Sequence, residues 1–115
     1  MPSKHSAYAT LIDIRENIQR AQRFVADLTY KTFYEDDRTV YAVTRCLEII
    51  SGASRRLPDE LKARHPHMPW RDIADAGNIY RHGYEAVEEP ELWDTVHRDL
   101  PSLLRVVETE LALFP

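Results

Sequence analysis

The sequence is poor in the residues that build stapled or loop-rich folds. Glycine occurs three times and cysteine once, at Cys46. A single cysteine excludes an internal disulfide, and the apolar neighbours Leu47 and Ile49 predict that its side chain is buried in a reducing compartment. A chain of 115 residues can bury a core without a disulfide or a metal. We therefore expect one cytoplasmic domain spanning residues 1–115.

Several functional classes also lack their usual sequence signals. No stretch approaches the roughly 20 apolar residues of a membrane span, so no membrane association is expected. There is no Gly-rich phosphate loop and no serine elbow. His65 and His67 precede Pro69 without a nearby cysteine or a His-x-x-x-His pair, which is weak evidence for zinc. The sequence predicts neither a metal nor a cofactor.

The charge balance is acidic, but its cations are mostly of one kind. Fifteen Lys and Arg residues face 19 Asp and Glu residues, a formal net charge of −4. This balance disfavours nonspecific attraction of nucleic acid over the whole surface and leaves a local basic site open. All the cations except Lys4, Lys31 and Lys62 are arginine, whose planar fork suits phosphates and carboxylates.

Apolar residues recur at three- and four-residue steps along most of the chain, which predicts amphipathic helices. We expect long helices over residues 6–30, 37–51, 70–85 and 90–113, with a short connector helix at 59–64. Asp36 or Asp37 is the expected cap of the second helix. Pro101 should bend or divide the last helix, because a proline inside a helix removes a hydrogen bond. The predicted fold class is all-α, an up-and-down four-helix-type bundle with a short extra connector helix.

A polar stripe on the helix predicted at 70–85 carries the first candidate site residues. At about 100° per residue, an arc of roughly 60° holds Arg71, Asp75, Asn78 and His82. A histidine beside an amide and a carboxylate, with arginine nearby, has the groups needed for proton transfer and phosphate binding. A solvent-facing stripe with ordinary ion pairs would show the same pattern.

The helix predicted at 37–51 offers a companion set in Arg38, Tyr41, Arg45 and Glu48. Arg45 and Glu48 can simply pair with each other. If this surface meets the stripe of His82, Arg45 can contact an anion and Glu48 can orient another side chain.

Residues 68–84, MPWRDIADAGNIYRHGY, resemble the signature segment of the HepT-like proteins in the HEPN superfamily. RCLEIISGA at 45–53, LP at 57–58 and WDTV with DLP at 93–101 extend this resemblance over nearly the whole chain. It implies a homodimeric helical bundle with two polar signature helices beside a shared cleft. It also implies the toxin half of a bacterial toxin–antitoxin module, which cleaves RNA without a metal.

The resemblance further implies a partner and a set of roles. The usual antitoxin is a MntA-like minimal nucleotidyltransferase, which silences the toxin by transferring AMP to a tyrosine. By position, His82 matches the catalytic histidine, Asn78 the polar residue after the motif arginine, and Tyr84 the modified tyrosine. Asp75, Arg45 and Glu48 would then line the substrate site.

The sequence departs from the family motif at Gly77, which stands where the motif has arginine. Loss of one preorganised donor can lower a rate by about 10²–10³, so Arg81, Arg71 or Arg45 would have to replace it. A helical glycine also requires a reason, such as close packing of another backbone. Three functions remain open: an RNase toxin, a catalytically degenerate HEPN dimer that binds a nucleotidyltransferase or RNA without cleaving it, and a structural interaction protein whose polar stripes are only solvated.

Overall fold

The computed structural model describes the backbone of residues 4–82 and 89–115 and the side chains of residues 7–77 and 92–115. These ranges are helical and contain no strand, which confirms the predicted all-α class. The elements are α1 (Lys4–Val25), α2 (Tyr30–Tyr34), α3 (Asp37–Arg55), α4 (Asp59–Ala63), α5 (Trp70–His82), α6 (Glu89–Asp94), the π-helix η2 (Thr95–Asp99) and α7 (Leu100–Leu111). Within these ranges, no helix has the length and apolar character needed to cross a membrane.

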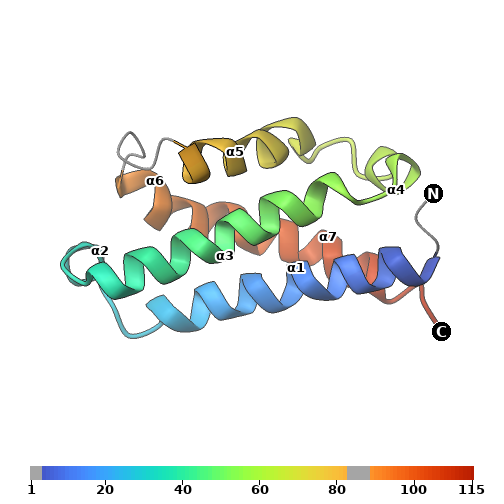
Figure 1. Ribbon diagram of the computed structural model, residues 1–115. Coiled ribbons are helices and arrows are strands. Elements are labelled where there is room, and N and C mark those ends of the chain that lie inside the picture. The colour runs from blue at the N-terminus through green and yellow to red at the C-terminus, as the bar shows by residue number, and fades with distance from the viewer. Residues whose placement is uncertain (1–3, 83–88) are drawn as a thin grey trace.

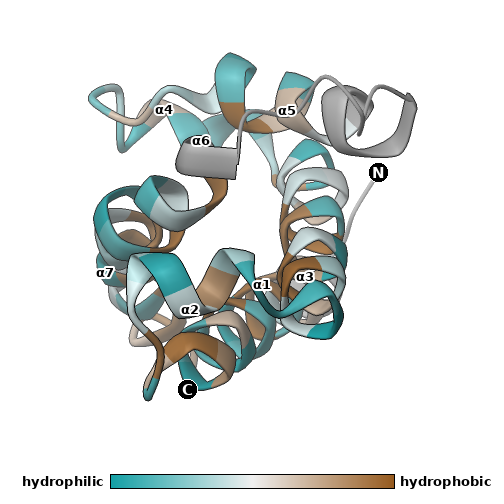
Figure 2. Cartoon of the chain, turned by 90° about the vertical axis from the view of Figure 1, so that its left-hand side faces the viewer, coloured by the Kyte–Doolittle hydropathy of each residue, from teal (hydrophilic) through white to brown (hydrophobic). Residues whose placement is uncertain are grey.

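Four helical segments form an up-and-down bundle. α1, α3, α5 and the final segment α6–η2–α7 run in alternating directions, and α3 lies between α1 and α5 (Figure 1). Viewed end-on, the apolar sides of α1, α3 and α7 turn toward the interior (Figure 2). Fully buried side chains such as Ile14, Ile18 and Val43 fill this core. Each contributes about 1.5–3 kcal/mol through removal of apolar surface from water.

The first helix is shorter than its apolar spacing predicted. α1 ends at Val25 rather than near residue 30, and Tyr30 belongs to the separate helix α2. The Thr29 hydroxyl accepts the Thr32 N–H at 3.1 Å, while the Thr32 hydroxyl accepts the Thr29 N–H at 2.8 Å. This reciprocal cap stabilises a new helix start. Local capping therefore overrides a periodicity that continues through Leu28.

The start of α3 is as predicted, whereas its end is not. Asp36 caps the helix and accepts the Thr39 N–H at 3.2 Å and the Thr39 hydroxyl at 2.8 Å, and these bonds lower the pKa of its carboxyl. α3 then runs past Gly52 to Arg55. A glycine costs a helix about 1 kcal/mol, which burial of the following Ala53 offsets.

Pro101 divides the last helix, as its position predicted. The Leu100 N–H donates to the Thr95 carbonyl, five residues earlier, in the π-helix η2. Because Pro101 has no N–H, the regular bond to the carbonyl of His97 cannot form, and the helix widens just before α7 begins.

An ion cluster around the buried carboxylate of Glu110 holds the α4 end of the bundle and the approach to α5. Arg64 donates to both carboxylate oxygens of Glu110, at 2.6 and 3.2 Å, and His65 Nε2 lies 2.7 Å from the same carboxylate. The hydrogen bonds from Arg64 are the main reason that the pKa of Glu110 is lowered. The Trp70 indole N–H donates to the carbonyls of Lys62 and His65, at 3.1 and 3.0 Å. These contacts fix the first residue of α5.

Candidate active site

α5 is attached to the bundle through a direct contact with α3. The Ser51 hydroxyl donates to the Ala74 carbonyl at 2.9 Å and accepts the Gly77 N–H at 2.8 Å. Ser51 is 2% exposed and Gly77 is buried. The close packing expected at Gly77 is present, although the contact comes from a side chain rather than from another backbone. It sets the rotation of α5 about its own axis.

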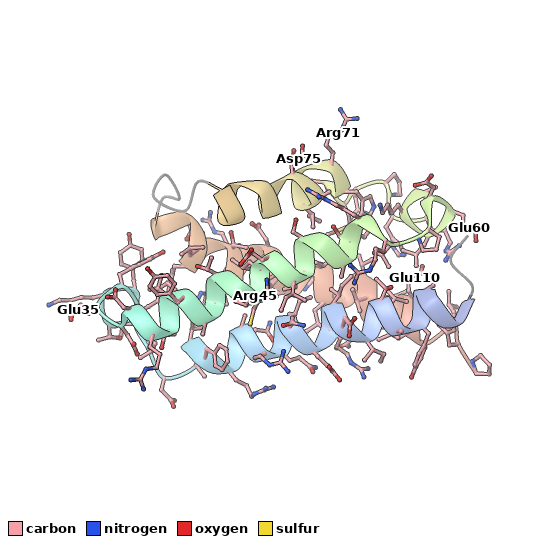
Figure 3. All side chains as sticks on the ribbon, viewed as in Figure 1. Glu35, Arg45, Glu60, Arg71, Asp75 and Glu110 are labelled. Atoms are coloured by element: carbon pink, nitrogen blue, oxygen red, sulfur yellow. The ribbon has the colours of Figure 1, made fainter. Side chains whose placement is uncertain are left out.

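That rotation turns one polar face of α5 toward solvent. Arg71 and Asp75 are exposed and project away from the bundle (Figure 3). The backbone positions of Asn78 and His82 follow on the same helix, and at about 100° per residue they fall on the same face. The side chains of Asn78, Arg81 and His82 lie outside the described part of the chain, as does all of Tyr84, so their roles stay predictions.

The direction of α3 brings the backbone of the second polar set level with the end of α5. The two helices are antiparallel (Figure 1), and Ser51 lies opposite Gly77. His82 is five residues further along α5, about 7.5 Å at the helical rise, which places its backbone level with position 46 of α3. Arg45 is therefore at the correct height, and Glu48 lies between it and Ser51.

Arg45 and Glu48 form the local ion pair that the sequence allowed. Arg45 Nη1 lies 3.8 Å from a Glu48 carboxylate oxygen, with the two side chains 69% and 19% exposed. A pair this open to water contributes little to stability. The Arg45 guanidinium thus remains available to an anion at the end of α5.

An arginine of α3 that the sequence reasoning did not select contacts α5. Arg55 donates to the Ala74 carbonyl from Nε at 3.1 Å and from Nη2 at 2.6 Å. It was missed because the helix was expected to end near Gly52. Helical spacing could have indicated Arg55, since Arg45, Glu48 and Arg55 follow one another at turns of a single continuous helix.

Axial distance separates these arginines into two groups. Ala74, which Arg55 contacts, precedes His82 by about 12 Å along α5, and Arg71 precedes it by about 16 Å. Arg71 lies six residues before position 77, about 9 Å along the helix. Arg55 lies closer to position 77, because the Ala74 carbonyl that it binds also accepts the Ser51 hydroxyl, which in turn accepts the Gly77 N–H. Arg45 is the described α3 arginine whose backbone is level with that of His82.

The opposite side of α5 carries a pocket of about 430 Å³, bounded by α3, η2 and α7. Its floor is apolar, with Leu47, Ile73 and Leu103, and its ionisable lining is formed by His67, Asp72 and Asp99. Among the residues whose side chains are described, no arginine or lysine lines it. Carboxylates repel phosphates, so this pocket does not suit a nucleic-acid backbone.

The remaining chemical candidates have structural roles in the described part of the chain. Cys46 is buried, as predicted, and burial raises the pKa of its thiol. His65 is engaged with Glu110. Over the described residues, no group of three His, Cys, Asp or Glu side chains is placed to hold a metal ion.

The fold and this polar helix define a helical-bundle protein whose candidate chemistry lies along α5 and the facing part of α3. Residues 14–110 match the family described as Ribonuclease HepT-like, and the chain belongs to this family. The resemblance seen in the signature segment is thereby confirmed.

The chain is similar to several archaeal and bacterial proteins over most of its length. It is 39% identical to "Probable ribonuclease HepT" of Thermococcus cleftensis over 103 residues, which are 90% of this chain and 92% of the relative. It is 34% identical to "Putative RNase MJ1380" of Methanocaldococcus jannaschii over 106 residues, 92% of this chain and 97% of the relative. "Putative RNase TTE0752" of Caldanaerobacter subterraneus is 31% identical over 84 residues, 73% and 75% of the two chains. No solved structure gives a significant match.

Proposed function

We propose that this chain is a metal-independent endoribonuclease that acts in the cytoplasm as a homodimer and serves as the toxin of a type VII-like HepT/MntA toxin–antitoxin module. Membership in the HepT-like ribonuclease family supports the ribonuclease activity. The single observation that carries the site is the fixed rotation of α5 by Ser51, which directs the face of Arg71 and Asp75 outward.

In this proposal, chemistry takes place at the end of α5. His82 acts as general acid or base on a ribose 2′-hydroxyl or on the leaving oxygen, and Arg45 binds the phosphate on which negative charge develops. Asn78 and Arg81 contribute a polar group and a second cation beside His82. Arg71, Asp75 and Glu48 contact or orient the flanking part of the substrate. A dimer would place a second such face across a shared cleft.

The direct experiment is cleavage of a mixed cellular RNA by the purified chain in excess EDTA. We expect cleavage to persist, because the proposed catalytic groups are an imidazole and guanidinium groups rather than a metal-bound water. Loss of cleavage in EDTA with recovery on adding a divalent cation would contradict the metal-independent mechanism. Absence of RNA cleavage under every condition would contradict the proposal that the chain is an enzyme.

Arg45 gives a prediction specific to the α3–α5 register. The variant Arg45→Ala should lower kcat/KM for RNA cleavage about 100-fold, because it removes a charged donor at the phosphate. Arg105→Ala is the matched control, since Arg105 is an exposed arginine on α7 whose guanidinium bonds only to Ser102 among the described residues. Equal rates for the two variants would remove Arg45 from the site.

Gly77 supports a second candidate function, a degenerate HEPN dimer that binds a nucleotidyltransferase or RNA without cleaving it. The variant Gly77→Arg distinguishes this degenerate dimer from an active ribonuclease. Because Gly77 is buried against Ser51, we expect an arginine there to displace α5 and to reduce cleavage at least tenfold. New or increased cleavage in Gly77→Arg would favour degeneration from an ancestor with the complete motif.

The antitoxin proposal concerns Tyr84 and a MntA-like nucleotidyltransferase. Incubation of the chain with that enzyme and ATP should add the mass of an adenylyl group, detected by intact mass spectrometry, and should stop RNA cleavage. Tyr84→Phe should stay unmodified and remain active in the presence of the partner. Modification of Tyr84→Phe to the same extent would place the acceptor elsewhere.

A further inference from the structure

A cluster of aromatic side chains joins α2 to the last helical segment. The Trp93 ring centroid lies 5.6 Å from that of Phe33 and 6.2 Å from that of Tyr30, and the Tyr30 ring lies 4.9 Å from the Tyr34 ring. The His97 ring lies 4.0 Å from Trp93, with 31° between the ring planes. The three separations among the Phe, Tyr and Trp rings are typical of stabilising aromatic pairs.

The inner part of this cluster is explained by the fold, and the outer part is not. Phe33 is fully buried, and the Tyr34 hydroxyl accepts the Trp93 backbone N–H at 3.0 Å, which ties α2 to α6. Tyr30 is 48% exposed and His97 is also exposed, although both rings pack against Trp93. We refer to Tyr30, Trp93 and His97 as the outer aromatic cluster.

The outer aromatic cluster lies at the end of the bundle where the candidate active site ends. α5 runs toward this end and stops at His82, and α6 and α2 are both found there (Figure 1). Cations follow both outer rings in the chain. Lys31 lies 4.0 Å from the Glu35 carboxylate, whereas Arg98 is exposed and makes no ion pair with the residues that the structure describes.

We infer that the outer aromatic cluster is a base-stacking subsite for single-stranded RNA, an inference that rests on the proposed ribonuclease function. Unpaired bases stack on aromatic rings, including histidine, and this stacking tolerates any sequence. The Tyr30 and His97 rings are already held by Trp93, so stacking a base on them orders few additional torsions. Arg98 contacts a phosphate of the same strand. The substrate is thus a single strand that extends past His82 toward η2.

The test is fluorescence anisotropy with a short, labelled 2′-O-methyl RNA oligonucleotide. This probe has no free 2′-hydroxyl, so binding is measured without cleavage and independently of His82. Tyr30→Ala and His97→Ala should each raise the dissociation constant about tenfold, which is the effect of losing one stacked base. Tyr8→Ala is the matched control, because Tyr8 is a similarly exposed ring, packed edge-on to Phe114, outside the outer aromatic cluster. It should change the constant less than twofold.

A second probe separates stacking from altered folding or phosphate contacts. With an abasic oligonucleotide of the same length and charge, Tyr30→Ala and His97→Ala should bind as the unsubstituted chain does. Three results would each overturn the subsite. The first is that Tyr30→Ala and His97→Ala bind the base-containing probe as tightly as the unsubstituted chain does. The second is that these variants lose as much affinity for the abasic probe as for the base-containing one, and the third is that the unsubstituted chain does not bind RNA. A change of oligomeric state in Tyr30→Ala without any change in RNA affinity would also overturn it and identify a protein interface. Failure of the ribonuclease proposal is recognised separately, as RNA binding without cleavage of unmodified RNA.

Discussion

Replacing His82 by alanine is expected to lower the rate of RNA cleavage by about 10²–10⁴-fold, because a positioned general acid or base contributes an effect of this size. The loss should appear mainly in kcat, since the imidazole acts on a proton that moves in the transition state rather than on the bound substrate. Single-turnover cleavage of a defined RNA, with enzyme in excess, measures the chemical step directly.

The matched control for His82 is His67, an exposed histidine in the turn before α5. His67→Ala removes an imidazole from the rim of the pocket between α5 and α7, on the side away from Arg71 and Asp75. Its cleavage rate should stay within about twofold of the unsubstituted chain. If His82→Ala retained full activity, the proposed site on α5 would be wrong, whatever the result for Arg45.

Replacing Glu110 by alanine is expected to lower the free energy of unfolding by about 3 kcal/mol. The variant loses charged hydrogen bonds to Arg64 and His65 and leaves a small cavity in a buried position. Glu110→Gln keeps the volume and should lose roughly half as much. Urea unfolding followed by circular dichroism gives these values. Glu108→Ala, an exposed neighbour on α7, should change stability by less than about 0.5 kcal/mol.

The contribution of Glu110 to the free energy of unfolding should decrease as the pH is lowered. Its pKa is lowered in the folded chain from the ordinary value of 4.5, chiefly by the hydrogen bonds from Arg64. A lowered folded pKa means that the stabilisation is fully present above the unfolded pKa and is lost as the pH falls through the folded pKa. The stability difference between the unsubstituted chain and Glu110→Gln should therefore narrow from neutral pH to about pH 3. A difference that stays constant over this range would show that the carboxylate charge is not what stabilises the cluster.

The Glu110 cluster joins α7 to the turn before α5, whereas the proposed active site lies at the far end of α5. Arg64 and His65 fix the turn before α5, and Trp70 extends that attachment to its first residue. The middle of α5, five residues before His82, is positioned by Ser51 on α3. We therefore expect Glu110→Gln to reduce stability with little effect on kcat at temperatures where the chain stays folded.

The features that could be predicted from the sequence are those set within a few residues of the chain. Apolar spacing predicted most of the helices, Asp36 was one of two expected caps, and Pro101 was expected to interrupt the last helix. Each depends on hydrogen bonds or steric contacts that reach no further than one or two helical turns. The local signal that was overlooked, the reciprocal cap of Thr29 and Thr32, moved the end of α1 to Val25.

The arrangement of the candidate site was decided by contacts between distant parts of the chain. Ser51 meets Gly77 across 26 residues and Arg55 meets Ala74 across 19, and no local pattern specifies such pairings. The sequence by itself determined the helical class, most helix positions and the polar residues that α5 and α3 carry. Only the tertiary structure decided which face of α5 is exposed and that Arg45, rather than Arg71, is level with His82. The physical reason is that helical periodicity fixes the angle between residues of one helix, whereas the register between two helices follows from the side chains that pack at their contact.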